Sequence, residues 1–236
     1  MELQVADLRV TCILTSYNRP RMVRQALGSV ARQTHRNHEL LVFDDSTIFD
    51  VREAVAEFHL PSVRVFHTDV GPERRARENR LGVNCNRGLA EATGDLVCFL
   101  ADDDFFFPTW FTAAVRFMAD KPAIAVCYGR LSYSTSPQME YPRRRGQDLF
   151  PGKVLDDPRC QVDHNQVMHR NFQPPFRWPE EFGATMNCDA LYFYEISRKH
   201  TFHPLDAPAA VKRMHQKNLQ RTLTDVQNGA AEGTRE

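Results

Sequence analysis

The sequence predicts an α/β protein with a mostly parallel central sheet that is flanked by helices. Short apolar runs alternate with segments of helical periodicity over the first hundred residues, which is typical of repeated β-α-β units. The run Leu96–Leu100 is apolar at every position, as a strand covered on both faces must be. Polar clusters follow three of these runs, and parallel sheets bind their ligands where the strands end.

In the first half, each predicted strand is followed by a predicted helix. Val10–Thr15 is rich in β-forming residues, and Pro20 then begins a helix whose apolar residues recur at helical spacing as far as Val30. Glu39–Phe43 is the second predicted strand. The elements that follow are a helix at about Phe49–Phe58, a strand at Val63–Phe66, a long helix at Glu73–Ala92 and the strand Leu96–Leu100. Strands joined by helices pair in parallel through right-handed crossovers.

The second half has fewer regular elements and one long polar segment. Trp110–Lys121 predicts a helix and Ile124–Leu131 a strand. The stretch Ser132–Asp157 is rich in Pro, Arg and Gly, which predicts a loop. Its basic part, Arg143–Arg145, could close over a ligand or lie as a plain surface loop. The remaining predicted elements are a strand at Val162–His169, a helix at Asn187–Ser197 and a disordered tail from Gln227.

The composition excludes several classes of protein. Thirty basic and thirty acidic side chains cancel, so no overall field favours nucleic acid or anionic lipid. The six cysteines include no Cys-x-x-Cys pair, which argues against a zinc or thioredoxin-like site. The first seven residues lack the apolar core of a signal peptide, and no apolar stretch approaches the ~20 residues of a membrane span. We therefore expect a cytoplasmic protein without a transmembrane segment that binds no nucleic acid.

Sequence signatures of several nucleotide-binding and hydrolytic classes are missing. No Gly-x-Gly-x-x-Gly follows the first strand, which argues against a dinucleotide oxidoreductase. The chain has no Gly-Lys-Ser/Thr of a P-loop NTPase. It also has no Gly-x-Ser-x-Gly nucleophile elbow of a hydrolase.

Asp102, Asp103 and Asp104 directly follow the strand Leu96–Leu100 and the single Ala that ends it. Three adjacent carboxylates repel one another, so their clustering at the end of a buried strand calls for a compensating cation. Oxygen ligands of this kind suit Mg²⁺ or Mn²⁺, which keep positions open for phosphate oxygens. The alternative is a solvated acidic turn that caps the next helix, but the apolar flank Phe105–Phe107 favours a metal site.

Asp44 and Asp45 follow the second strand in the same way. Asp44 could cap the next helix, whereas Asp45 could accept a hydrogen bond from a nucleobase N–H. Four arginines, at positions 74, 75, 77 and 80, fall within two turns of one predicted helix, where most would be solvated and salt-bridged. One or two of them could reach a diphosphate, because guanidinium binds phosphate bidentately.

Asp189 and two histidines are further candidates for the chemistry. Asp189 stands before the apolar run Ala190–Tyr194, so it is either a helix cap or a catalytic base, and periodicity does not choose between them. His164 and His169 would lie on opposite faces of a predicted strand and so would not share a metal ion. A single histidine as an additional metal ligand or diphosphate contact stays open.

Motifs in both halves resemble those of family 2 glycosyltransferases of the GT-A fold. In the first half they are Val10–Arg19, which ends in Thr-Ser-Tyr-Asn-Arg, then Leu41–Thr47, and Asn86–Asp95 leading into Ala101–Asp104. The second half resembles the branch of that family represented by the spore-coat polysaccharide glycosyltransferase, in the segments Val162–Arg170, Asp189–Phe193 and Phe202–Asp206. The resemblance extends over most of the chain and implies the GT-A type nucleotide-diphospho-sugar transferase fold.

The resemblance also implies which residues contact the nucleotide. They are Thr15, Tyr17, Asp45, Arg75 and Asp102. Among them, Asp45 would contact the base, Arg75 would lie near the diphosphate and Asp102 by the ribose.

The resemblance also implies a metal ligand and a general base. The spore-coat branch points to Asp103 as the ligand of Mn²⁺ or Mg²⁺, whereas the wider Asp-x-Asp pattern points to Asp104. Asp189 matches the position of the general base, and the family implies inversion at the anomeric carbon.

The implied activity is transfer of a sugar from a nucleoside-diphosphate sugar of the UDP, dTDP or GDP type. The acceptor would be a hydroxyl of a saccharide or of a glycosylated small molecule. We expect one domain, with residues 1–105 as its nucleotide-binding half, 106–226 as its acceptor-binding half and 227–236 as a tail; an oligomer is possible. The alternatives are a nucleotidyltransferase, which would release pyrophosphate, and a non-catalytic nucleotide-sugar-binding protein.

Overall fold

The computed structural model describes residues 8–136, 138–139, 141, 148–181, 183 and 188–214. Within these residues the strands are β1 (Val10–Ser16), β2 (His38–Asp44), β3 (Val63–His67), β4 (Leu96–Ala101), β5 (Phe105–Phe106), β6 (Val126–Ser134), β7 (Val167–Arg170) and β8 (Phe202–Arg213). The helices are α1 (Pro20–Ala31), α2 (Val51–Val55), α3 (Pro72–Arg75), α4 (Arg80–Glu91), α5 (Trp110–Asp120) and α6 (Cys188–Ser197), with a 3₁₀ turn, η1, at His164–Gln166.

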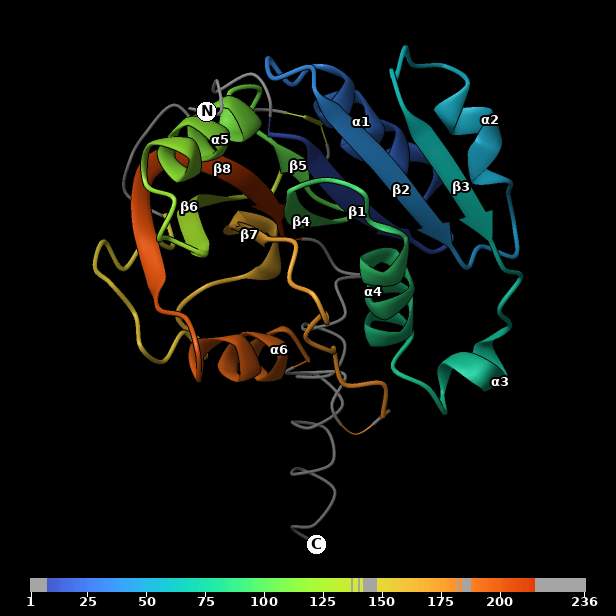
Figure 1. Cartoon of the computed structure of the whole chain (residues 1–236). Helices are drawn as coiled ribbons and strands as arrows, with labels where there is room; N and C mark the ends of the chain where they lie inside the picture. Colours follow the sequence, from blue (N-terminus) through green and yellow to red (C-terminus); the bar gives the residue numbers. More distant parts are fainter. Residues whose placement is uncertain are drawn as a thin grey trace, which may run out of the picture.

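The eight strands form one sheet in the order β3-β2-β1-β4-β7-β6-β8-β5 (Figure 1). Strands β3, β2, β1 and β4 pair in parallel, and β6 and β8 are also parallel to each other. Strand β7 is antiparallel to both β4 and β6, and β5 is antiparallel to β8. The predicted α/β fold with a mostly parallel sheet is confirmed. Because β1 lies between β2 and β4, the carboxyl ends of these three strands are neighbours.

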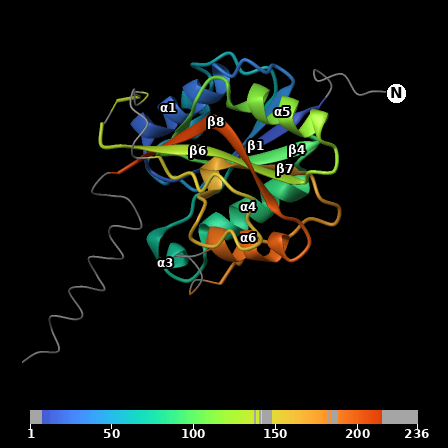
Figure 2. The ribbon, with the colours of Figure 1, turned by 90° about the vertical axis from the view of Figure 1, so that its left-hand side faces the viewer.

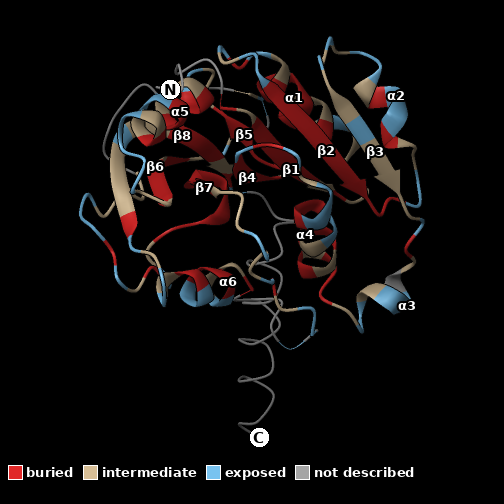
Figure 3. Ribbon diagram, in the orientation of Figure 1, coloured by how far each residue is buried: buried red, intermediate tan, exposed pale blue. Residues whose placement is uncertain are grey.

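Helices cover both faces of the sheet, so the molecule has three layers. Figure 2 shows α1 and α5 on one face and α4 and α6 on the other. Side chains of β1 alternate between two cores: Cys12 and Leu14 pack with α1 and α5, whereas Ile13 packs with α4 and α6. Strands β1, β2 and β4 are accordingly buried almost throughout, whereas β3 and the outer helix faces are more exposed (Figure 3). No helix in the described part of the chain has both the length and the apolar character that crossing a bilayer requires.

Helix α4 packs closely against β1 and against the segment that contains Pro179. A Cβ added at Gly88 would stand 2.6 Å from Cγ2 of Ile13, and one added at Gly82 would stand 2.0 Å from the Pro179 carbonyl oxygen. Glycine at these two positions allows both approaches. Arg80 and Asn84, in the first part of α4, reach Asp45 at the end of β2.

The prediction of one long helix over Glu73–Ala92 is wrong, because the chain forms two helices, α3 and α4. Asn79 is the N-cap of α4, and its side-chain oxygen accepts a hydrogen bond from Gly82 N. The residue before it, Glu78, instead forms an isolated antiparallel bridge with Glu181. The arginines that helical periodicity places on one helix are thus divided between two. The predicted helix Phe49–Phe58 is likewise shorter, because Asp50 caps α2 at Val51.

The prediction of a strand over Val162–His169 is wrong in its first half. Asp163 and Gln166 form a capping box, in which each side chain hydrogen-bonds the other residue's backbone N–H. This local pairing turns the chain into η1, and β7 begins only at Val167. His164 lies in η1 and His169 lies in β7, so the two histidines do not lie on opposite faces of one strand.

Two strands were not predicted, namely β5 and the long β8. Pro204 and Pro208 argue against a strand by sequence alone, but the register with β6 shifts between Tyr128 and Arg130 and accommodates them. Strand β6 also continues to Ser134, into the stretch that was interpreted as a loop. Arg143–Arg145 and the tail 227–236 lie outside the described residues.

The buried His169 makes stability depend on pH. Its Nδ1 lies 2.7 Å from the Arg170 carbonyl oxygen and its Nε2 lies 3.0 Å from the Tyr192 hydroxyl. Burial lowers the pKa of His169 to about 4, whereas a histidine in an unfolded chain titrates near 6.5. Between these values the unfolded chain binds a proton that the folded protein does not, so stability falls as pH falls.

We expect this residue to remove about 2 kcal/mol of unfolding free energy between pH 7 and pH 5. Urea unfolding at the two pH values measures the change. In His169→Gln the decrease in unfolding free energy between pH 7 and pH 5 should be smaller by about 2 kcal/mol. Any loss of packing in this variant lowers the unfolding free energy equally at both pH values. The exposed His59 supplies the control, His59→Gln. Equal drops in wild type and His169→Gln would contradict the prediction.

Candidate active site

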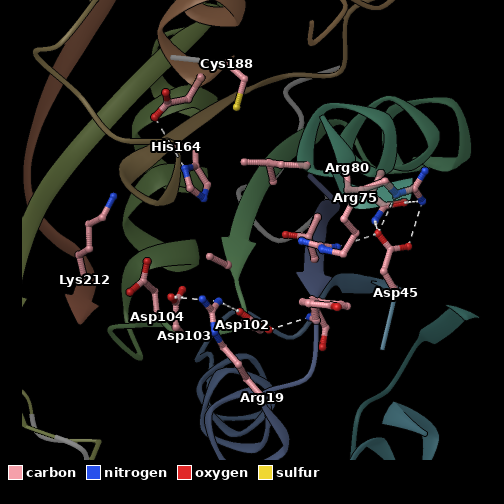
Figure 4. A pocket seen from close by; sticks show the side chains of 17 residues that line it. Arg19, Asp45, Arg75, Arg80, Asp102, Asp103, Asp104, His164, Cys188 and Lys212 are labelled. Carbon is pink, nitrogen blue, oxygen red and sulfur yellow. Dashed lines mark hydrogen bonds and ion pairs between the residues drawn. The ribbon is translucent and has the colours of Figure 1, made fainter. Parts of the chain in front are cut away.

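A pocket lies at the carboxyl ends of β1, β2 and β4, with α4 on one side and α6 and the end of β8 on the other (Figure 4). All eight residues that were predicted as site residues line it. They are Thr15, Tyr17, Asp45, Arg75, Asp102, Asp103, Asp104 and Asp189. Other polar residues that were not predicted as site residues line it as well, among them Ser16, Arg19, Arg80, Asn84, His164 and Lys212.

Asp45 lines the pocket beside Tyr17 and Arg75, and its carboxylate is held by three side chains. Arg80 binds it bidentately, with Nε 2.9 Å from Oδ2 and Nη2 3.0 Å from Oδ1. Asn84 donates to Oδ2 at 3.0 Å, and Arg75 Nη1 lies 3.4 Å from the same oxygen. Arg80 is only 4% exposed, so it is not one of the solvated arginines that the helical pattern favours. Burial opposes the charge of Arg80, but hydrogen bonds to Asp45 and Glu78 raise its pKa.

Asp44 does not cap the following helix, because Asp50 occupies that position. Its side chain instead accepts a hydrogen bond from the Ser46 hydroxyl at 2.6 Å and lies 2.8 Å from His67 Nδ1. These contacts of Asp44 fix the conformation of the loop after β2, and Asp45 faces the pocket.

Tyr17 and Arg75 form the wall beside Asp45. The guanidinium carbon of Arg75 lies 3.6 Å from the centroid of the Tyr17 ring, within the range of a cation–π contact. The backbone N–H of Tyr17 donates to Asp102 Oδ2 at 2.8 Å. This contact ties the loop after β1 to the acidic run after β4. A flat ring, a carboxylate and a guanidinium thus meet in one corner, and these are groups that bind a nucleobase and a phosphate.

Arg19 neutralises the first two carboxylates of the acidic run. Its Nη1 lies 2.7 Å from Asp102 Oδ1 and 3.1 Å from Asp103 Oδ2, and Figure 4 shows the guanidinium between the two side chains. Burial raises the pKa of Asp102 to about 6, against the opposing effect of Arg19. The cation that three adjacent carboxylates call for is therefore supplied in part by the protein itself.

Asp104 is turned toward the last strand. Its Oδ2 accepts a hydrogen bond from Asn165 at 2.7 Å, and its Oδ1 accepts one from the backbone N–H of Arg213 at 2.8 Å. Burial and the neighbouring Asp103 raise the pKa of Asp104 well above its usual range, while Lys212 opposes them. The end of β8, which was not predicted as a strand, thus carries the positive charge that faces this carboxylate.

Asp189 belongs to the first turn of α6 and lines the pocket. Its Oδ2 lies 3.8 Å from His164 Nδ1, and the same nitrogen lies 3.5 Å from Asp163 Oδ1. The other oxygen of Asp163 accepts a hydrogen bond from the Lys212 ammonium. Asp189 is therefore a pocket carboxylate with a histidine beside it, and not only a residue that favours the start of a helix.

Asp163, His164 and Asp189 are also the one trio among the described residues whose metal-binding atoms lie within 4.8 Å of one another. These three residues could hold a metal ion. Lys212, bound to Asp163, already places a positive charge at this cluster. The Lys212 ammonium therefore compensates the Asp163 carboxylate without an ion.

The site residues that sequence patterns missed have weak local signals. Arg19 stands within a polar strand-end cluster, so its position pointed to the pocket but its partners did not. Arg80 and Asn84 are four residues apart, on one helix face, which predicts only that they are neighbours. Lys212 lies in β8, a strand whose two prolines argued against its prediction. Each of these residues acquires its role from a partner at least 35 residues away in the chain.

These features define a class: an enzyme-like α/β domain that presents carboxylates and guanidinium groups at the switch point of a parallel sheet. The family description "Glycosyl transferase family 2" matches residues 11–201. The chain belongs to this family, which confirms the resemblance seen in its first motifs. The narrower resemblance to the spore-coat branch stays a prediction.

Curated relatives and solved structures agree with this assignment. Protein CgeD of Bacillus subtilis is 29% identical over 211 residues, which are 84% of this chain and 48% of that protein. The Escherichia coli enzyme UDP-Glc:alpha-D-GlcNAc-diphosphoundecaprenol beta-1,3-glucosyltransferase WfgD is 28% identical over 174 residues, 73% of this chain and 65% of that protein. The chain thus spans about half of CgeD and just under two thirds of WfgD.

Two structural neighbours share the GT-A fold at low sequence identity. Residues 1–349 of Staphylococcus aureus TarS, in complex with UDP, superpose with a TM-score of 0.68 at 15% identity, covering 89% of this chain and 61% of that one. The mannosyltransferase PcManGT from Pyrobaculum calidifontis, in complex with GDP-Man and Mn²⁺, gives a TM-score of 0.63 at 16% identity, covering 97% and 65%. These likenesses show the fold.

Proposed function

We propose that this protein is an inverting glycosyltransferase that uses a nucleoside-diphosphate sugar, a divalent cation and Asp189 as general base. One observation carries the proposal. The residues implied to contact the nucleobase, the ribose and the metal, and the residue implied to accept the proton, all line a single pocket. They come from five separate segments of the chain. Chance would not bring Asp45, Arg75, the acidic run and Asp189 to one cavity.

Asp103 and Asp104 are the residues proposed to hold the cation, and their geometry is compatible with that role. Each oxygen of Asp104 accepts one hydrogen bond and so keeps one lone pair. Asp103 lines the same pocket beside it. Two adjacent carboxylates suit Mg²⁺ or Mn²⁺. When bound, the ion would neutralise negative charge on the departing nucleoside diphosphate.

The chain's own residues would then perform the transfer. Asp189 accepts the proton of the acceptor hydroxyl, whose oxygen forms a bond to the anomeric carbon. The bond from that carbon to the diphosphate oxygen breaks, and its electron pair leaves with the nucleoside diphosphate. Attack from the side opposite the leaving group inverts the configuration. Arg75 stabilises the charge on the departing diphosphate.

The donor is proposed to be of the UDP, dTDP or GDP type, because the structural neighbours were crystallised with UDP and with GDP-Man. The acceptor is proposed to be a hydroxyl of a saccharide or of a glycosylated small molecule, as in the relative named for a glycosylated lipid diphosphate. The cytoplasmic location and the division into halves at residue 105 stay predictions.

Thermal unfolding with nucleoside diphosphates tests the proposal. We expect UDP, dTDP or GDP to raise the melting temperature, and to raise it further with Mn²⁺, because a ligand that binds only the folded state stabilises it. At 100 times its Kd the gain is about 2.7 kcal/mol, or roughly 5–10 °C for a domain of this size. No shift with any of the three at millimolar concentration, with or without Mn²⁺, would contradict the proposal. Release of nucleoside diphosphate rather than pyrophosphate from the sugar nucleotide then separates transfer from a nucleotidyltransferase.

A further inference from the structure

His164 lies between the proposed base and the acidic run, and its ring is fixed on two sides. Only 8% of the residue is exposed. Its Nδ1 lies 3.5 Å from Asp163 Oδ1 and 3.8 Å from Asp189 Oδ2. The second distance is that of an ion pair rather than of a hydrogen bond. The imidazole packs edge-on against Trp178, with ring centroids 6.2 Å apart, so little freedom is left to the ring.

The other ring nitrogen, Nε2, is buried and has no hydrogen-bond partner within the described residues. In Figure 4 the ring lies between Cys188 on one side and Asp103 and Asp104 on the other, with its second nitrogen turned toward the pocket. Leaving a buried polar group without a partner costs free energy, and few such groups remain in folded proteins. A ligand atom at this position would remove that cost.

The surroundings of His164 indicate what kind of group that is. Nδ1 faces the carboxylates of Asp163 and Asp189, so this nitrogen carries a hydrogen. A hydroxyl group can either donate or accept a hydrogen bond. It therefore satisfies Nε2 whether or not that nitrogen also carries a hydrogen.

The arrangement of residues along the pocket indicates where that hydroxyl lies. Tyr17 and Asp45 form the nucleotide end, and the acidic run faces the diphosphate. A base must lie within about 3 Å of the hydroxyl that attacks the anomeric carbon, so the transferred sugar lies between the acidic run and Asp189. His164 stands beside that space.

We propose that His164 binds the donor sugar through a hydrogen bond between Nε2 and a sugar hydroxyl, while Nδ1–H orients the Asp189 carboxylate. The inference rests on the proposed function, because it takes Asp189 as the base. In this inference His164 both recognises the sugar and positions the Asp189 carboxylate. Asp45, Arg75 and Tyr17 bind the nucleotide part of the donor.

Two conservative substitutions separate the two contacts. In His164→Asn the amide nitrogen takes the place of Nδ1 and nothing replaces Nε2. In His164→Gln the longer side chain places its amide nitrogen near Nε2 and leaves the Asp189 contact unfilled. The probes are UDP, UDP-glucose and UDP-GlcNAc, or the corresponding dTDP or GDP ligands if the thermal series selects another base. Calorimetric titration gives the affinity that the sugar adds to that of the nucleoside diphosphate, and donor hydrolysis gives turnover.

We expect the nucleoside diphosphate to bind both variants within twofold of wild type. His164→Asn should lose about five- to tenfold of the affinity that the sugar adds. His164→Gln should keep that affinity and lose about tenfold in kcat. The inference is overturned if both variants match wild type, if wild type gains no affinity from either sugar, or if both lose nucleoside diphosphate binding alike, which indicates a structural role. The proposed function fails separately: wild type then binds no nucleoside diphosphate, or Asp189→Asn retains full turnover.

Discussion

Asp189→Asn should lower sugar transfer by about 10²–10⁴-fold, the usual contribution of a positioned general base. The amide keeps the size of the side chain but does not accept the proton of the acceptor hydroxyl. In the described part of the chain no hydrogen bond or ion pair joins Asp189 to Tyr17, Asp45 or Arg75, so we expect the Kd for the nucleoside diphosphate to stay within twofold. Single-turnover rates and calorimetric titration on the same preparations measure both quantities.

A matched control is available on the same helix. Glu195 lies on α6 with its side chain 51% exposed, and it does not line the pocket. Glu195→Gln removes one negative charge from the same element and should leave kcat unchanged. Full transfer activity in Asp189→Asn with normal donor binding would show that another group accepts the proton.

Asp103→Asn and Asp104→Asn should each lower metal-dependent hydrolysis of the donor by about 10²-fold or more, because each removes a charged oxygen ligand of the proposed cation. We also expect each to weaken binding of Mn²⁺ in the presence of the nucleoside diphosphate, measured by electron paramagnetic resonance. Asp120→Asn, at an exposed position at the end of α5, is the control and should change neither quantity.

The two variants should differ in stability, and this difference makes their comparison informative. Both oxygens of Asp104 accept hydrogen bonds, from Asn165 and from the backbone of Arg213. An amide at position 104 directs N–H groups at one of these donors, so Asp104→Asn should unfold at a lower temperature than Asp103→Asn. If both variants leave metal-dependent hydrolysis and Mn²⁺ binding unchanged, the proposed metal site is wrong. The trio Asp163, His164 and Asp189 is then the other metal-binding candidate.

The order of strands and helices in the first half could be predicted because local patterns carry it. Apolar runs such as Leu96–Leu100 must be covered on both faces, and the polar residues that end them collect at one edge of a parallel sheet. For this reason Asp45 and the acidic run Asp102–Asp104 were placed together correctly. The family motifs then added Arg75 and Asp189, which no periodicity selects.

Elements that depend on distant contacts could not be predicted in this way. Asn79 ends one helix and starts another because its backbone N–H bonds the Glu180 carbonyl oxygen, 3.0 Å away. Strand β8 contains two prolines and forms because β6 offers it an edge with a shifted register. In both cases a tertiary contact outweighs local propensity.

Local sequence patterns were enough to predict the α/β fold and the acidic edge of the sheet at which Asp45 and Asp102–Asp104 meet. They did not show how those charges are compensated. Arg19 bridges Asp102 and Asp103, Arg80 holds Asp45, and Lys212 pairs with Asp163 beside His164. Ion pairing and desolvation depend on distance and burial in space, and spacing along the chain encodes neither.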